Sequence, residues 1–260
     1  MIICFSGTGN TARCARKLAA ILDEEFLLLN GENLTDPEAC SIPKVSGRVI
    51  WAFPTYSWGV PPVMTDYITK VRADESVSRV PHYMLTTCGD DIGQTDRVWR
   101  RLVARRGWHP KAEYSVIMPN TYVAMPGFNV DPPEVAERKL LEAEDRINEI
   151  ARLIRSGADT RLLHPGAFSF IKTAVVYPWF RRFGMSPRPF RSNEGCIGCG
   201  KCAQACPMQN IRMTDSRPGW SKTCAMCLRC YHICPRRAVA YGSSTDGKGQ
   251  WQGSMSFLSQ

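Results

Sequence analysis

The sequence GCIGCGKCAQACP at residues 195–207 is followed, after a short connection, by CAMCLRCYHICP at residues 224–235. Both stretches have the spacing C-x2-C-x2-C-x3-C-P, and together they contain eight of the twelve cysteines in the 260-residue chain. Two-residue gaps let one tight turn present three thiolates to a single metal centre. We therefore predict eight metal ligands, which are Cys196, Cys199, Cys202, Cys206, Cys224, Cys227, Cys230 and Cys234.

Two kinds of metal centre suit these thiolates. Soft thiolate ligands bind iron–sulfur clusters and also zinc, and C-x2-C pairs occur in many zinc sites. Zinc sites rarely use a third cysteine at the next two-residue step, whereas this chain has one there twice. The full spacing is that of [4Fe-4S] motifs. We therefore expect two [4Fe-4S] clusters, with zinc as the alternative.

Residues 193–242 resemble the two-cluster ferredoxins of bacteria, through the doubled motif quoted above. In that motif the fourth cysteine ligates the other cluster. The resemblance implies one cluster held by Cys196, Cys199, Cys202 and Cys234, and a second held by Cys224, Cys227, Cys230 and Cys206. The two halves also form an internal repeat, in which Cys196 aligns with Cys224 and Ile211 with Val239. Each half is expected to add a short helix and a strand, giving a small α+β domain.

The first half of the chain alternates short apolar runs with helical patterns. Expected strands cover residues 1–5, 26–29, 49–53, 82–87 and 113–118. A long helix is expected to open at Pro132 and Pro133, with Asp131 as its cap, and to stop at Gly157. Five strands that alternate with helices predict an α/β fold built on a doubly wound parallel sheet.

The loop after the first expected strand is the second motif of the chain. It contains Ser6, Gly7, Thr8, Gly9, Asn10 and Thr11. Backbone N–H groups, hydroxyls and the first turn of a helix can together enclose a terminal phosphate. The loop resembles the FMN phosphate loop of flavodoxins, S/T-x-T-G-x-T, and the resemblance implies FMN. Two alternatives stay open: a dinucleotide fingerprint, Gly7-x-Gly9-x-x-Ala12, or an ordinary strand–helix turn.

The flavodoxin resemblance also implies where the flavin ring lies. In such folds the flavin binds at the carboxyl ends of the strands, near the point where the strand order reverses. Two loops are expected there, and their predicted FMN contacts are Pro54, Thr55, Tyr56, Ser57, Trp58 and Gly59, then Cys88, Gly89 and Asp90. Tyr56 and Trp58 offer rings for stacking, or they only cover the sheet. Residues 120–122 are a third candidate loop.

The carboxylates of Asp90 and Asp91 are expected beside this ring. Carboxylates raise the energy of a reduced, anionic flavin, so we expect them to tune it. Arg181 and Arg182 could offset them by folding over the ring.

Charge and composition limit the classes of partner. The formal charge of +9 counts the ligand cysteines as neutral, although they must bind as thiolates, so the basic balance does not indicate nucleic-acid binding.

Residues 161–191 interleave cations with aromatic side chains. A connector that packs aromatics between the domains is favoured over a segment that binds single-stranded nucleic acid. Residues 168–180 are too short to span a bilayer, so no membrane insertion is expected. Twelve cysteines without a signal peptide predict a reducing cytoplasm.

The whole order of segments resembles the flavodoxin–ferredoxin fusion proteins of anaerobes, known as EFR-type ferredoxins. The expected divisions are a flavodoxin-like FMN domain at residues 1–157, a basic and aromatic connector at 158–192, a two-[4Fe-4S] ferredoxin domain at 193–242 and a surface tail at 243–260. The resemblance implies intracellular electron transfer between FMN, the clusters and redox partner proteins. No catalytic residues are identified. The alternative is an FMN and iron–sulfur reductase of a small organic substrate, and the oligomeric state stays open.

Overall fold

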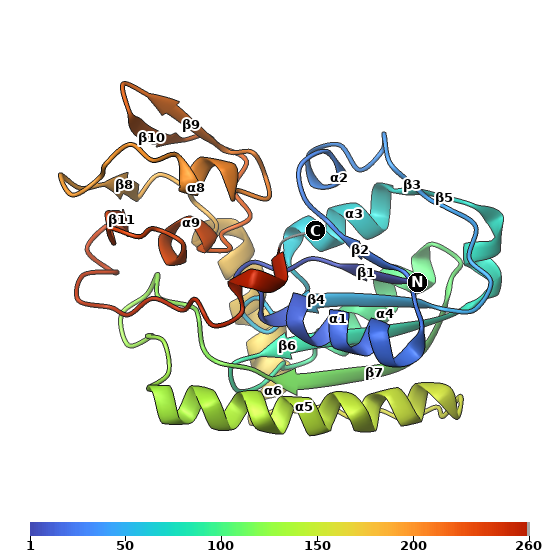
Figure 1. The fold of residues 1–260 in the computed structure, drawn as a ribbon. Helices are drawn as coiled ribbons and strands as arrows, with labels where there is room; N and C mark the ends of the chain where they lie inside the picture. Colours follow the sequence, from blue (N-terminus) through green and yellow to red (C-terminus); the bar gives the residue numbers. More distant parts are fainter. Residues whose placement is uncertain (259–260) are drawn as a thin grey trace.

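The computed structural model describes residues 1–258, and its elements alternate between strands and helices through the first 155 residues (Figure 1). The larger elements there are β1 (Ile2–Cys4), α1 (Asn10–Leu22), β2 (Phe26–Leu28), β4 (Val49–Pro54), α3 (Pro62–Lys70), β6 (Pro81–Cys88), α4 (Thr95–Arg105), β7 (His109–Ile117) and α5 (Pro133–Arg155). The short ones are α2 (Glu32–Thr35), β3 (Ser41–Ile42), β5 (Arg72–Ala73) and η1 (Glu75–Arg79).

The main sheet has five strands in the order β2-β1-β4-β6-β7, and every neighbouring pair is parallel. The order reverses direction at β1, which makes the sheet doubly wound and flavodoxin-like, as the sequence predicted. The strand β7 starts four residues earlier than expected, because residues from His109 onward continue the pairing with β6.

Side chains alternate between two apolar cores on the two faces of the sheet. In β1 and the residue after it, Ile3 and Phe5 enter one core with α3 and α4, while Ile2 and Cys4 enter the other with α1 and α5. This alternation follows from the two-residue period of a strand. Burial on both faces explains why β1 and β4 read as continuous apolar runs.

The long helix α5 starts at Pro133 as expected, but Asp131 does not cap it. The carboxylate of Asp131 instead accepts hydrogen bonds from the backbone and side chain of Asn120 and pairs with Lys139. The ion pair and hydrogen bonds hold the pKa of Asp131 below its usual value against the opposing effect of burial. The aspartate thus fixes the loop after β7.

One buried histidine lies inside the first core. His82 is fully buried, and its ring stacks on those of Trp51 and Trp108, which also stack on each other. Its Nδ1 accepts from Trp51 Nε1 at 3.0 Å, so its Nε2–H donates to the carbonyl of Val77 at 2.9 Å. Burial lowers the pKa of His82 to about 4, with a small contribution from nearby His109.

Because its folded pKa lies below the unfolded value of about 6.5, His82 is expected to destabilise the fold as the pH falls from 6.5 toward 4. Between pH 7 and pH 5 the free energy of unfolding should fall by about 2 kcal/mol through this group alone. His82→Gln can keep both hydrogen bonds and does not titrate, so melting curves at pH 7, 6 and 5 should show a weaker pH dependence. Equal pH dependence in the two proteins would contradict the assignment.

The C-terminal unit contains β8 (Phe190–Ser192), α8 (Lys201–Gln204), β9 (Ile211–Thr214), β10 (Arg217–Trp220), α9 (Arg229–His232) and β11 (Val239–Tyr241). The strand β11 pairs with β8, and β9 pairs with β10, both antiparallel. Each cysteine motif therefore contains a short helix and is followed by a strand, so each half has the helix and strand that the internal repeat predicted. Figure 1 shows this unit at the edge of the large sheet where the carboxyl ends of its strands lie.

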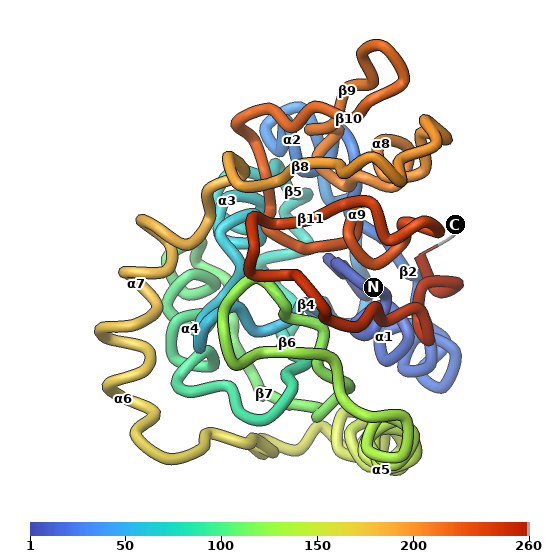
Figure 2. The backbone as a smooth tube through the Cα atoms, turned by 90° about the vertical axis from the view of Figure 1, so that its left-hand side faces the viewer, coloured from blue at the N-terminus to red at the C-terminus, as the bar shows by residue number. Residues whose placement is uncertain are grey.

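The connector forms a helix with π-helical turns along the side of the sheet domain (Figure 2). It consists of α6 (Ser169–Ile171), η2 (Lys172–Val176), α7 (Tyr177–Trp179) and η3 (Phe180–Gly184). The expectation that its aromatics pack between the domains is only partly right. Tyr177 and Phe180 are buried, whereas Phe168, Phe170, Trp179 and Phe183 are exposed. Only one face of the helix is turned inward, so the remaining rings stay on the surface.

The last helix, η4 (Met255–Leu258), lies against α1, and the tail that leads to it crosses the start of α1 (Figure 2). Among residues 1–258, no helix combines the length and the apolar character that crossing a membrane requires.

Candidate functional site

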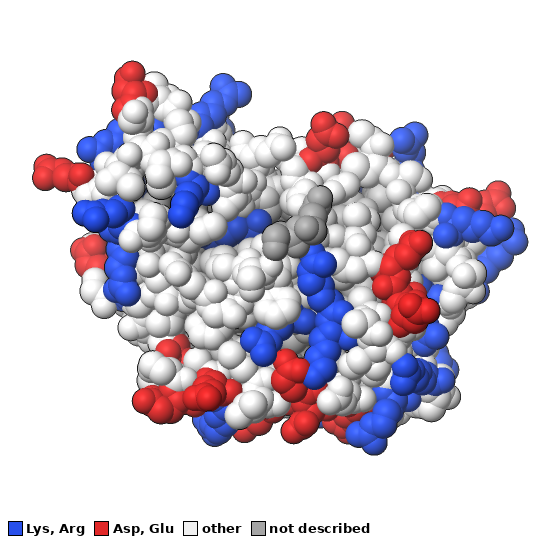
Figure 3. Space-filling view, viewed as in Figure 1, with Lys and Arg blue, Asp and Glu red and all other residues white. Residues whose placement is uncertain are grey.

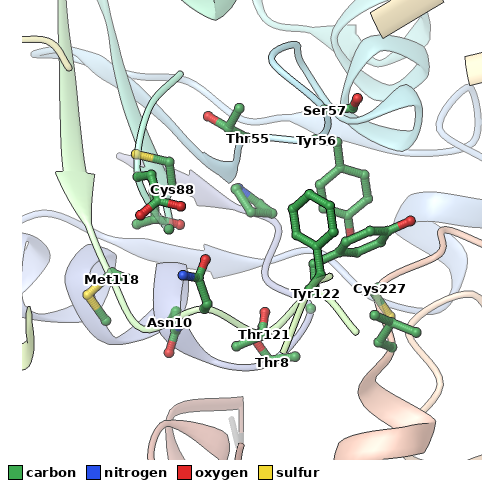
Figure 4. Close-up of a pocket in the computed structure, with 18 of the residues that line it drawn as sticks. Thr8, Asn10, Thr55, Tyr56, Ser57, Cys88, Met118, Thr121, Tyr122 and Cys227 are labelled. Atoms are coloured by element: carbon green, nitrogen blue, oxygen red, sulfur yellow. Dashed lines mark hydrogen bonds between the residues drawn. The ribbon is translucent and has the colours of Figure 1, made fainter. Parts of the chain in front are cut away.

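A cavity of about 410 Å³ lies at the carboxyl ends of β1, β4, β6 and β7. It is lined by every residue predicted to contact FMN except Gly9 and Gly59. Gly59 faces the ring of Tyr177 instead, and Gly9 faces the C-terminal tail. Figure 4 shows Tyr56, Tyr122 and Cys227 at one end of the view, and Cys88 and Met118 at the other.

The predicted phosphate loop presents buried hydroxyls at the start of α1. Ser6 Oγ accepts from the backbone N–H of Ala12, and Thr11 Oγ1 lies 2.7 Å from Thr87 Oγ1. Asn10 Nδ2 donates to the carbonyl of Pro119 at 2.8 Å, which ties the loop to residues after β7. The first turn of α1 contains no acidic residue. Because helix N-termini and hydroxyls favour anions, this end of the cavity fits a phosphate group.

The loop after β4 makes a tight turn at the edge of the cavity. Ser57 and Trp58 both have positive φ, at 45° and 63°, and Tyr56 and Gly59 exchange two backbone hydrogen bonds across them. Left-handed conformations at two residues with side chains are uncommon and cluster at functional sites. The amine of Lys172 lies 5.0 Å from the centroid of the Trp58 ring. The turn keeps Tyr56 and Trp58 at the cavity wall.

The carboxylates expected to tune the flavin are both next to lysines. Asp91 pairs with Lys172 at 2.6 Å, and Lys139 lies 3.9 Å from Asp90, whose side chain is 80% exposed. Both aspartates line the cavity as expected, and a lysine lies beside each of them. The expectation that Arg181 or Arg182 offsets them is wrong, because neither residue lines the cavity.

Part of the cavity wall was not predicted from the sequence. Met118 and Pro119 line the cavity ahead of the third candidate loop, and Val176, Trp179 and Phe180 reach it from the connector. Residues 120–122, the third candidate, do line it. The side chain of Asn120 lies directly over Gly89, where an added Cβ would be 1.7 Å from Asn120 Oδ1. No local pattern marks the connector residues, because only the packing of that helix brings them to the site.

The second cysteine motif also reaches the cavity, through Met226, Cys227 and Leu228. A Cβ on Gly7 would lie 2.9 Å from the Cβ of Cys227 and 3.0 Å from its carbonyl oxygen. The predicted phosphate loop and the predicted cluster motif are therefore in direct contact.

Some cysteines of one motif lie close enough to those of the other to influence their pKa. Burial raises the pKa of the Cys230 thiol well above its usual value, and nearby thiolates raise it further; they belong to Cys227, Cys224 and Cys206. Burial also raises the pKa of Cys202, and weaker contributions that raise it come from Cys234 and Cys196. Such mutual effects require proximity, so Cys206 lies with the second motif and Cys234 with the first.

Backbone N–H groups donate to the sulfurs in a repeated pattern. Asn210 N donates to Cys206 Sγ at 3.4 Å, and Ala238 N donates to Cys234 Sγ at 3.2 Å. Both bonds join a fourth cysteine to the residue four positions on, and such donors stabilise thiolate ligands of clusters. Within residues 1–258, no three His, Cys, Asp or Glu side chains converge as the ligands of one metal ion do. The thiolates of a four-iron cluster bind different irons and stand farther apart, so this observation concerns mononuclear sites.

A buried histidine ties three segments together behind the second motif. His232 Nε2 donates to the carbonyl of Thr121, and its Nδ1 accepts from the backbone N–H of Trp251. The indole of Trp251 donates to Asn10 Oδ1 at 2.8 Å. The tail, the loop after β7 and the phosphate loop are thus joined across the cysteine unit.

The fold and the site define a flavodoxin-like α/β domain joined to an iron–sulfur domain. Residues 195–239 match the family model described as "4Fe-4S dicluster domain". Over 46 residues the chain is 41% identical to a subunit of the ion-translocating oxidoreductase complex of Methanosarcina acetivorans. That match covers 17% of this chain and 17% of the relative, so it concerns the cysteine unit alone.

Two solved structures are similar to part of this chain. The "Trp Repressor Binding Protein from Bacillus subtilis" is 14% identical, with a TM-score of 0.37 over 57% of this chain and 96% of its own. A flavodoxin of the Streptococcus strain TIGR4 is 16% identical, with a TM-score of 0.34 over 58% of this chain and 96% of its own.

Proposed function

We propose that the chain is an electron-transfer flavoprotein that relays electrons between FMN and two [4Fe-4S] clusters, and that it belongs to the EFR-type flavodoxin–ferredoxin fusions. One observation carries the proposal: Cys227 lines the cavity predicted for FMN and packs against Gly7 of its phosphate loop. The iron–sulfur domain and the flavodoxin-like fold both suit electron transfer. FMN supplies exchange between two-electron and one-electron chemistry when it is bound.

The contact between Cys227 and Gly7 supports an order for the proposed relay. The group of Cys206, Cys224, Cys227 and Cys230 is proximal to the cavity, and we call its site the proximal cluster. The group of Cys196, Cys199, Cys202 and Cys234 forms the distal cluster site. Cys199 is exposed, whereas Cys230 is buried. Electrons would therefore pass between the cavity and a partner through the distal site.

The proposed partner at the distal site is an acidic redox protein in the cytoplasm. The exposed cations between residues 190 and 241 are Arg191, Lys201, Arg212, Arg217, Lys222, Arg236 and Arg237. The exposed acids between residues 190 and 241 are Glu194 and Asp215. Lys and Arg side chains are visible over this unit in Figure 3. Complementary charge speeds the encounter of such partners.

The alternative, a reductase of a small organic substrate, needs a proton donor over the flavin. Burial raises the pKa of Tyr122 and of Cys88 to about 12, and it raises the pKa of Tyr56 well above its usual value. Catalytic acids work best with a pKa near the operating pH, so these three candidates favour the carrier over the reductase.

Protein purified without oxygen is expected to contain about eight irons and one FMN per chain, given two four-iron sites and one phosphate loop. Iron and acid-labile sulfide assays and chromatography of the released flavin measure these contents. Stoichiometric zinc in place of iron would reject the clusters, and recovery of FAD or NAD would reject the flavin assignment.

A further inference from the structure

The cysteine unit extends one buried cation into the flavodoxin-like domain. Arg229 stands between Cys227 and Cys230 at the start of α9 and is only 6% exposed. Its Nε donates to the carbonyl of Gly7 at 2.6 Å, and its Nη2 donates to the carbonyl of Ser6. Its Nη1 donates to the carbonyl of Ala205 at 3.0 Å. The guanidinium therefore bridges the phosphate loop and both cysteine motifs.

Among residues 1–258, no carboxylate forms an ion pair with Arg229. A buried charge without an opposite charge is strongly unfavourable, and neutral carbonyls compensate it only in part. Under the proposed function, two anionic groups would lie near Arg229, one on each side. They are the flavin phosphate at the loop and the thiolate-ligated cluster at Cys227.

The carbonyl contacts also orient the loop. In a trans peptide the C=O and the N–H of one unit point in opposite directions. The carbonyls of Ser6 and Gly7 share peptide units with the N–H groups of Gly7 and Thr8. A guanidinium fixed on the carbonyl side leaves those N–H groups facing away from it. Donation to the carbonyl also polarises the peptide, which strengthens its N–H as a donor.

We infer that Arg229 is a positioning residue that couples the two cofactor sites: it holds the phosphate loop in its binding geometry and lends charge to both the phosphate and the proximal cluster. This inference rests on the proposed function. By reciprocity, FMN binding then stabilises the proximal cluster as much as that cluster favours FMN binding.

The internal repeat provides a matched control. Lys201 occupies the position of Arg229 in the other motif, between Cys199 and Cys202, and its side chain is exposed. Lys201→Met removes a cation from an equivalent place beside the distal cluster without touching the phosphate loop.

The test measures FMN affinity by fluorescence quenching in anaerobic, iron-replete protein from which the flavin has been removed. Arg229→Met is expected to weaken FMN binding by about tenfold to a hundredfold, the loss of hydrogen bonds from a charged donor. Arg229→Lys keeps the positive charge but loses the planar set of guanidinium donors, so it should give an intermediate FMN affinity. Lys201→Met should bind FMN as the wild type does. A second readout is the rate at which a chelator removes iron, which FMN should slow in the wild type and not in Arg229→Met.

Equal FMN affinity in Arg229→Met and Lys201→Met, with full iron in both, would overturn the coupling. If Arg229→Met does not assemble with full iron, the FMN affinity of Arg229→Lys tests the positioning role instead. An affinity equal to that of the wild type would then overturn that role. A wild type that binds no FMN rejects the proposed function itself and the coupling with it, so the two failures are separate results.

Discussion

Replacing Cys227 with Ala is expected to separate the flavin from the clusters while leaving the distal cluster in place. Cys227 is the predicted ligand that lines the cavity and contacts Gly7 of the predicted phosphate loop. Its loss removes a ligand of the proximal site, so the iron content should fall from about eight per chain toward four. Reductant delivered to the flavin should then reach the distal cluster slowly.

Cys199→Ala is the matched change at the equivalent position of the first motif. Cys199 is exposed and lies outside the cavity lining. This variant should show the same loss of iron but keep fast transfer from the flavin to the remaining cluster, while transfer to an external acceptor fails. Anaerobic stopped-flow spectroscopy follows the flavin and cluster bands separately in both proteins.

Indistinguishable kinetics in the two variants would contradict the proposed order of the relay. Slow flavin-to-cluster transfer in Cys199→Ala, with fast transfer in Cys227→Ala, would reverse that order. Either result would show that contact with Gly7 does not make the second motif the entry point.

The features that the sequence predicted well are those encoded within a few neighbouring residues. The cysteine spacing and the hydroxyl-rich loop each place their functional groups along one turn, so no distant contact is needed to recognise them. The doubly wound parallel sheet followed from the alternation of strands and helices, because such a sheet uses short connections between consecutive elements.

The missed features depend on packing between distant segments. Arg229 and Lys201 occupy equivalent positions in the repeat, yet only Arg229 is buried, because only the second motif packs against the phosphate loop. Lys172 neutralises Asp91 from 81 positions away. Comparing the two halves of the repeat would have marked position 229 for attention, but its burial is a property of the assembled domains.

Gly9→Ala is expected to be the most destabilising single-methyl change in the phosphate loop. Gly9 has a φ of 94°, and a Cβ there would lie 1.8 Å from the carbonyl oxygen of Ser254. The backbone at Ser254 cannot move away from this Cβ without displacing the C-terminal tail. That tail carries the bond from Trp251 to Asn10 and the contact of Phe257 with Arg16.

Gly107→Ala is the control that separates the cost of a left-handed backbone from the cost of the clash between an added Cβ and Ser254. Gly107 has a similar φ of 73°, and no atom of the described residues lies within 4 Å of its added Cβ. A left-handed alanine costs about 1–2 kcal/mol, so Gly107→Ala should lose about that much stability. Gly9→Ala should lose about 3–5 kcal/mol, because displaced contacts add to the strain. Thermal unfolding of the two variants under argon measures the difference.

The position of the tail gives an independent readout of the same contact. Lys248 donates to the carbonyls of Val123 and Met125, which holds the start of the tail against the loop after β7. Displacing the tail in Gly9→Ala should expose the bond after Lys248 to trypsin, while Gly107→Ala should resist as the wild type does. If both variants lose equal stability and resist trypsin equally, the close approach of Ser254 to Gly9 does not hold the tail. The glycine would then be required only for its backbone conformation at the start of α1.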